Sequence, residues 1–148
     1  MNKYSPDRVH RRVDYIQYTY SNTQIHPRAF EISSFPVAVY DHDGKIAGAN
    51  KIFRDVAGIT EEDILNRKAN IFDCINETNT ILIEAAHGAF DGEEKVYLSI
   101  SPALNTNGCI ADYQITLYPN AIFFPMSYDG DGVRLAGVLL DEETTDDD

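Results

Sequence analysis

The chain has 148 residues, of which 43% are apolar, and it carries a formal net charge of −12. This length suits one domain around one core, and the excess of acid argues against a nucleic-acid surface, which needs clustered Lys and Arg. No stretch approaches the roughly 20 apolar residues of a membrane-spanning helix, and the N-terminus lacks the apolar segment of a secretory signal. We therefore expect a cytoplasmic protein that contacts neither a membrane nor nucleic acid.

The first predicted element is an amphipathic helix. Ser5 and Pro6 supply a hydroxyl cap followed by proline at the first helical position, and the helical pattern runs to about Tyr20. Apolar residues recur on one side of it at Val9, Val13, Ile16 and Tyr20. This stripe is too short for an independent coiled coil, so it either docks on its own domain or pairs with a second chain. We predict a homodimer through these four residues.

A hairpin and two short helices follow. Two apolar runs, Pro36–Tyr40 and Ile46–Ala49, flank the turn pair Asp43-Gly44 and predict two antiparallel strands. Asn50 can then cap a helix that ends at Gly58. Thr60, followed by three acidic residues, predicts the start of a second helix.

The second half of the chain predicts one longer helix and three strands. An irregular apolar bridge over Lys68–Asn76 leads into a helical pattern over Glu77–Phe90. Three strands are then expected over Lys95–Ser101, Cys109–Phe124 and Val133–Asp141, joined by turns at residues 107–108 and 128–132. The order predicts an α+β domain: a five-stranded antiparallel sheet with helices over one face, preceded by the N-terminal amphipathic helix.

Charge is distributed unevenly along the chain. The last eight residues contain six acids, whereas residues 1–30 carry five basic and two acidic residues. The basic N-terminal helix and the acidic end could attract each other within one chain or across a dimer. The alternative is a solvated tail.

Over roughly Ile32–Glu142 the chain resembles the PAS sensory-domain family. The resemblance rests on the hairpin Val37–Ala49 with Ala49-Asn50 entering a helix, on Gly58–Ile64, and on the terminal strand Val133–Leu140. It implies three parts: residues 1–31 as a helical extension for capping or dimerisation, residues 32–142 as the sensor domain, and residues 143–148 as an acidic tail. In that family a pocket under the central helix binds a cofactor or metabolite, or stays empty, and the domain signals to a kinase or a transcription regulator.

We accordingly predict a small-molecule pocket between the central helix and the sheet. Its candidate lining residues come from the bridge, the helix and the strands: Ile71, Phe72, Cys74, Ile75, Leu82, Ala86, Tyr97, Tyr113 and Ile115. Ligand binding there would shift the last strand and the segment after it. The alternative is a ligand-free interaction and dimerisation module in which the space is filled by Ile71, Phe72, Ile75, Leu82 and Tyr97.

The resemblance leaves the ligand unknown. Flavin photoreceptors of the family place a reactive cysteine directly after an asparagine, whereas Asn70 is followed here by Ile71. Haem-binding members use a histidine near the start of the central helix, whereas His87 lies near its end. Neither haem nor an adduct-forming flavin is therefore expected. Cys74 lies roughly where other members attach a chromophore, but the flanking pattern is absent, which favours a buried structural thiol.

Catalytic and metal sites are not expected. The sequence contains no serine elbow, no glycine-rich phosphate loop and no His-x-x-x-His pair. Asp129 and Asp131 resemble calcium ligands, but no distal glutamate follows at loop spacing and a hairpin turn explains both. Cys74 and Cys109 form no CxxC pair, which favours free thiols over a disulfide or zinc site. An enzyme on a similar fold ranks third.

Overall fold

The computed structural model describes residues 6–21, 28–74, 80–97, 120–130 and 132–141. In chain order the elements are α1 Pro6–Ser21, β1 Val37–Tyr40, β2 Ile46–Ala49, α2 Lys51–Ala57, α3 Glu61–Leu65, η1 Ile71–Cys74, α4 Thr80–Gly88, η2 Ala89–Asp91, β3 Lys95–Tyr97, β4 Asn120–Asp129 and β5 Gly132–Asp141. Of these, η1 and η2 are 3-10 helices.

The five strands form one antiparallel sheet in the order β2-β1-β5-β4-β3, which confirms the predicted sheet. The last strand, β5, lies at the centre, where it pairs with β1 on one side and β4 on the other. The first and last strands of the chain, β1 and β5, are therefore neighbours in the sheet. A movement of β5 would displace strands on both sides of it.

The fourth strand differs from its predicted bounds. We predicted a strand over 109–124 and a turn from Tyr128, whereas β4 runs from Asn120 to Asp129 and residues 109–119 lie outside the described ranges. The register shifts between Pro125 and Tyr128, after which Tyr128 pairs with Val133. A bulge lets the strand continue past a proline that cannot donate a ladder hydrogen bond. The turn is therefore tighter than the sequence indicated.

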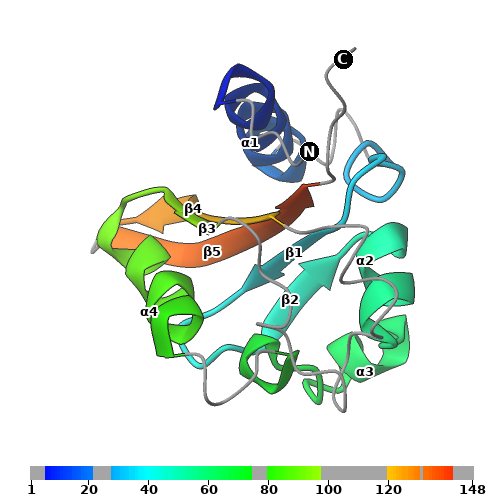
Figure 1. The fold of residues 1–148 in the computed structure, drawn as a ribbon. Helices are drawn as coiled ribbons and strands as arrows, with labels where there is room; N and C mark the ends of the chain where they lie inside the picture. The colour runs from blue at the N-terminus through cyan, green and yellow to red at the C-terminus, as the bar shows by residue number, and fades with distance from the viewer. Residues whose placement is uncertain (1–5, 22–27, 75–79, 98–119, 131, 142–148) are drawn as a thin grey trace.

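Both faces of the sheet are covered, because α1 lies on one face and α2, α3 and α4 lie on the other (Figure 1). Strand β1 is buried along its whole length, since Val37 and Val39 face α1 while Ala38 and Tyr40 face the other helices. We call the α1 side the outer layer and the α2–α4 side the inner layer. The expectation of helices over one face thus holds for the helices within the domain, and α1 adds a second layer.

The N-terminal helix docks on its own sheet. Val9, Val13 and Ile16 are buried in one cluster with sheet residues, and Gln17 Nε2 donates to the carbonyl of Pro125 at 2.7 Å. Tyr20 is half-buried at the edge of that cluster. Of the two alternatives for the stripe, the structure therefore has the intrachain one. These buried residues do not offer a dimer surface in this arrangement, and the homodimer stays a prediction.

The predicted caps of α2 and α3 are confirmed, whereas Ser5, the predicted cap of α1, lies outside the described residues. Asn50 caps α2 by accepting from the Phe53 amide at 3.0 Å, and Gly58 ends α2 in the left-handed region at φ 72°. Asn50 also accepts from the Val37 amide at 3.1 Å and donates to the Phe35 carbonyl at 2.8 Å. A fully buried amide therefore ties the start of α2 to the start of β1, a role beyond the predicted cap.

Within the described ranges, no helix is both long and apolar enough to span a bilayer.

Candidate ligand site and the C-terminal end of the sheet

Helix α4 is attached to the inner face of the sheet by a buried phenol. Tyr40 Oη donates to the carbonyl of Ala86 at 2.6 Å, and both residues have no exposed surface. Burial raises the pKa of Tyr40, so the phenol stays protonated and keeps donating. The small side chain of Ala86 lets α4 approach the sheet closely, as expected for an alanine on the buried side of the helix.

An imidazole–phenyl stack lies beside this contact. The His42 ring stacks on Phe90 with centroids 3.9 Å apart, and its Nε2 lies 2.8 Å from the carbonyl oxygen of Val133. Phe90 in turn meets Tyr40 edge to face at 5.7 Å. The hairpin turn, η2 and the start of β5 are thereby joined by one aromatic group of side chains. This group was not predicted, because the residues around His42 indicated only a hairpin turn.

The structure brings three of the predicted pocket residues together. Ile71 and Ala86 are buried in the inner apolar cluster, and the half-buried Phe72 packs against it. Cys74 lies on η1, Leu82 on α4 and Tyr97 on β3. The remaining three, Ile75, Tyr113 and Ile115, lie outside the described ranges. The predicted pocket therefore stays a prediction.

The structure describes the positions used above to distinguish flavin-binding from haem-binding members of the family. Asn70 accepts from the Phe72 amide at 2.9 Å and donates to the carbonyl of Asp43 at 3.1 Å, so it orders the bridge. The next residue, Ile71, packs its aliphatic side chain into the core. His87 is exposed near the C-terminal end of α4 and stacks on Phe72 with centroids 4.4 Å apart. The residue after Asn70 thus brings no thiol to the inner layer.

The last strand ends in a buried ion cluster. Asp141 has no exposed surface, and its two carboxylate oxygens accept from Arg8 Nη2 at 2.6 Å and from Arg12 Nη1 at 2.8 Å. The Arg12 guanidinium also lies 4.7 Å from the centroid of the Phe35 ring. We call these residues, Arg8, Arg12 and Asp141, the clasp, because they join α1 to the end of β5.

The clasp corrects the sequence prediction for Asp141, which was counted with the solvated acidic end. For this residue the alternative of attraction within one chain is the correct one. Two features carried the signal: Asp141 directly follows the apolar run Val138–Leu140, and Arg8 and Arg12 are four residues apart on one side of α1. Residues 142–148 lie outside the described ranges.

Solved structures of other proteins share the overall fold of this chain. A sensory-box sensor histidine kinase from Vibrio cholerae superimposes with a TM-score of 0.55 at 15% identity, over 86% of this chain and 96% of the other. The PAS domain of an HTR-like protein from Haloarcula marismortui gives 0.54 at 14% identity, over 92% and 98%. A LOV protein from Rhodobacter sphaeroides gives 0.55 at 16% identity, over 85% and 67%.

A further likeness is to a regulator that binds DNA. The Vibrio cholerae VqmA dimer, described as a LuxR-type receptor, gives a TM-score of 0.52 at 14% identity, over 85% of this chain and 53% of the other. No family model matches the sequence, and no curated protein matches it. At such identities the likeness concerns the fold, which is the PAS fold in the matched sensor domains.

Proposed function

We propose that this chain, which has the PAS fold, is a cytoplasmic signal-sensing module that binds a small molecule between α4 and the inner face of the sheet. The neighbours described above support this function, because they include a sensor histidine kinase and a LuxR-type receptor. They also suggest the class of output, a histidine kinase or a transcription regulator. The alternative is a ligand-free interaction module.

One observation carries the relay part of the proposal: β5 belongs to both layers and ends at the clasp. Val138 and Leu140 face the inner cluster, and Leu139 between them faces the outer cluster. Asp141 of the clasp directly follows Leu140 in the chain. A ligand that changes the packing under α4 would therefore change the position of β5 relative to α1. Such a ligand shifts the balance between two states only if it contacts them differently.

The ligand is tested on freshly purified protein. Native mass spectrometry and a visible absorption spectrum reveal any molecule that copurifies, and thermal unfolding against purines, flavins, aromatic acids and short carboxylates reveals others. We expect at least one compound to raise Tm progressively with its concentration, with a gain of about 2.7 kcal/mol in unfolding free energy at a concentration a hundredfold above its Kd. A bare mass together with no stabilising compound would support the ligand-free alternative instead.

The homodimer is proposed through the other side of α1. The stripe of Val9, Val13 and Ile16 is occupied by the sheet, whereas Tyr15, which lies outside the stripe on the same helix, is 45% exposed. A second copy packed along that side would bury the tyrosine. Sedimentation velocity should then give a dimer that becomes a monomer in Tyr15→Glu and persists in Tyr128→Glu, whose exposed ring lies at the far hairpin. A wild-type monomer, or a dimer unaffected by Tyr15→Glu, would contradict the proposal.

A further inference from the structure

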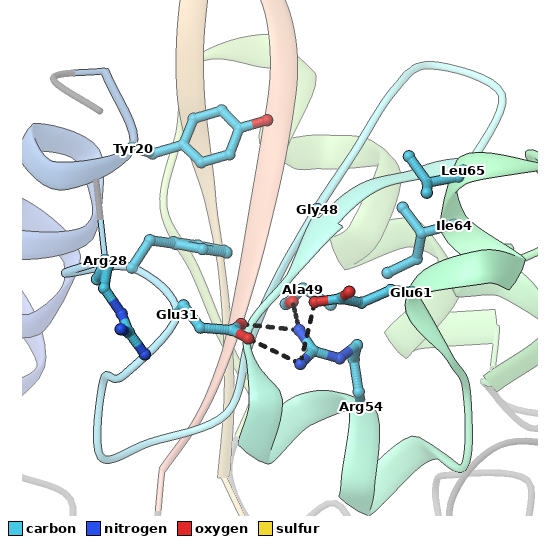
Figure 2. A pocket seen from close by; sticks show the side chains of 10 residues that line it. Tyr20, Arg28, Glu31, Gly48, Ala49, Arg54, Glu61, Ile64 and Leu65 are labelled. Atoms are coloured by element: carbon cyan, nitrogen blue, oxygen red, sulfur yellow. Dashed lines mark hydrogen bonds and ion pairs between the residues drawn. The ribbon is translucent and has the colours of Figure 1, made fainter. Parts of the chain in front are cut away.

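A second cleft lies outside the sheet–helix core. It has a volume of about 520 Å³ and opens over the edge strand β2, between the segment around Phe30 and helix α3 (Figure 2). Its floor is Gly48 and Ala49. Volumes of this size are typical of small-molecule sites. None of the residues predicted to line the inner pocket takes part in it.

The side walls of the cleft are apolar and partly aromatic. On one side Tyr20 and Phe30 meet edge to face with centroids 5.3 Å apart. On the other side Ile64 is half-buried and Leu65 is 81% exposed. A Cβ atom added at Gly48 would lie 3.4 Å from the Tyr20 ring, so the glycine lets this ring lie close over the floor of the cleft. The walls therefore suit a flat apolar body that would cover the exposed leucine.

The lower end of the cleft is polar and offers acceptors (Figure 2). Arg54 Nη1 donates to Glu31 Oε1 at 2.8 Å and to the carbonyl of Ala49 at 2.7 Å. Its Nη2 donates to Glu31 Oε2 at 2.8 Å and lies 3.5 Å from Glu61 Oε1. Both terminal nitrogens of the guanidinium are thus engaged, while the carboxylates of Glu31 and Glu61 are 37% and 69% exposed.

The cleft is lined by two arginines and two glutamates, so their formal charges cancel and the preferred ligand charge depends on which of these groups are accessible. The hydrogen bond from Arg54 lowers the pKa of Glu31, so this carboxylate is ionised at neutral pH. Aromatic faces and carboxylates both attract an ammonium group. An anion would have to use Arg28, which is exposed at the rim. The two choices can be separated by experiment because they predict opposite preferences among ligands with the same ring.

We propose that this cleft is a second ligand site, which takes an aromatic amine with its ring between Phe30 and Leu65 and its ammonium toward Glu31 and Glu61. The site goes beyond the proposed sensor function, since it lies on the edge strand and shares no residue with the inner pocket. Its ligand would contact three parts of the chain at the same time: the segment around Phe30, strand β2 and helix α3.

Tryptamine is a suitable probe because the chain contains no tryptophan, so indole fluorescence reports the ligand alone. Titration into the full chain is compared with indole-3-acetate and indole, which share the ring and carry a negative charge or none. We expect saturable tryptamine binding with a Kd about tenfold lower than that of either relative. No saturable tryptamine binding, or indole-3-acetate binding as tight as tryptamine, would overturn the proposal.

Matched variants locate the bound probe. Gly48→Val fills the floor and should weaken tryptamine binding at least about tenfold, whereas Ala47→Val, at an exposed position on the same strand, should leave it unchanged. Glu61→Gln keeps the size of a side chain that is 69% exposed and should weaken binding about fivefold. Wild-type affinity in Glu61→Gln or Gly48→Val would overturn the assignment. Gly48→Val should keep any stabilisation by inner-pocket ligands, which distinguishes failure of this site from failure of the sensor proposal.

Discussion

The two layers on the sheet are held in different ways. The outer layer is a single helix, α1, that comes from one end of the described chain and attaches through a stripe of apolar side chains and the clasp. The inner layer consists of α2–α4, which lie between strands of the sheet in sequence and are tied by buried hydrogen bonds from Asn50 and Tyr40. We therefore expect that the outer layer can detach without unfolding of the sheet, whereas the inner layer cannot.

The largest effect is expected at the clasp. Asp141→Asn removes the negative charge between two part-buried arginines, and we expect a loss of about 3 kcal/mol in the free energy that holds α1 on the sheet. Chemical unfolding monitored by circular dichroism measures it. Asp55→Asn is the matched control, because Asp55 pairs with Lys51 on the exposed side of α2 and should change stability by less than about 0.5 kcal/mol. Equal effects of the two variants would contradict a special role for the clasp.

The inner layer is tested at Gly44. This residue has φ 82°, and an added Cβ would lie 2.3 Å from the Phe72 ring. Gly44→Ala should therefore cost about 1 kcal/mol for the backbone conformation and about 1 kcal/mol more for displacing Phe72. Gly92→Ala isolates the first contribution, since Gly92 has φ 88° and no atom within 4 Å of an added Cβ. Equal melting temperatures for the two variants would show that Phe72 yields without cost.

A smaller effect is expected at the phenol that attaches α4. Tyr40→Phe leaves the buried carbonyl of Ala86 without this donor and should cost about 1.5 kcal/mol of unfolding free energy. Tyr128→Phe, at a ring that is 63% exposed, should have no measurable effect. Hydrogen exchange in the Tyr40→Phe protein should accelerate in α4 and not in α1. Faster exchange in α1 instead would argue that the layers are not independent.

The smallest effect concerns pH. The hydrogen bond from Arg54 lowers the pKa of Glu31 from its ordinary value of 4.5, so its contribution is present above pH 4.5 and is lost as the pH falls through the folded-state pKa. Glu31→Gln should therefore be less stable than the wild type at neutral pH, and the difference should shrink on acidification. The two stability curves should converge below that pKa. A constant difference between them would mean that the Glu31 carboxylate contributes nothing through its charge.

Local rules predicted much of the fold from the sequence. The hairpin, the caps at Asn50 and Thr60 and the glycine at the end of α2 each depend on residues within a few positions, and the structure confirms them. The end of β4 was misplaced because a bulge at Pro125 is set by its partner strand.

Features formed by distant segments were not predictable in the same way. Asp141 meets Arg8 across 133 positions, so an acidic stretch read by itself gave no sign that its first residue is buried. The outer cleft combines three separate segments around Phe30, Gly48 and Leu65. The candidate inner pocket was predicted from a family resemblance, and the structure places Ile71, Phe72 and Ala86 of it in or against one cluster. Such sites depend on how the elements pack against one another. The spacing of apolar residues along the chain predicts the elements but not this packing.

Native-state hydrogen exchange on Asp141→Asn tests the difference between the layers most directly. If the clasp holds the outer layer, the amides of α1 should lose protection by roughly a hundredfold or more, while those of β1, β4 and β5 keep theirs. Protection of α1 that is unchanged, or a uniform loss across α1 and the sheet, would contradict a helix that detaches as a unit from the end of β5.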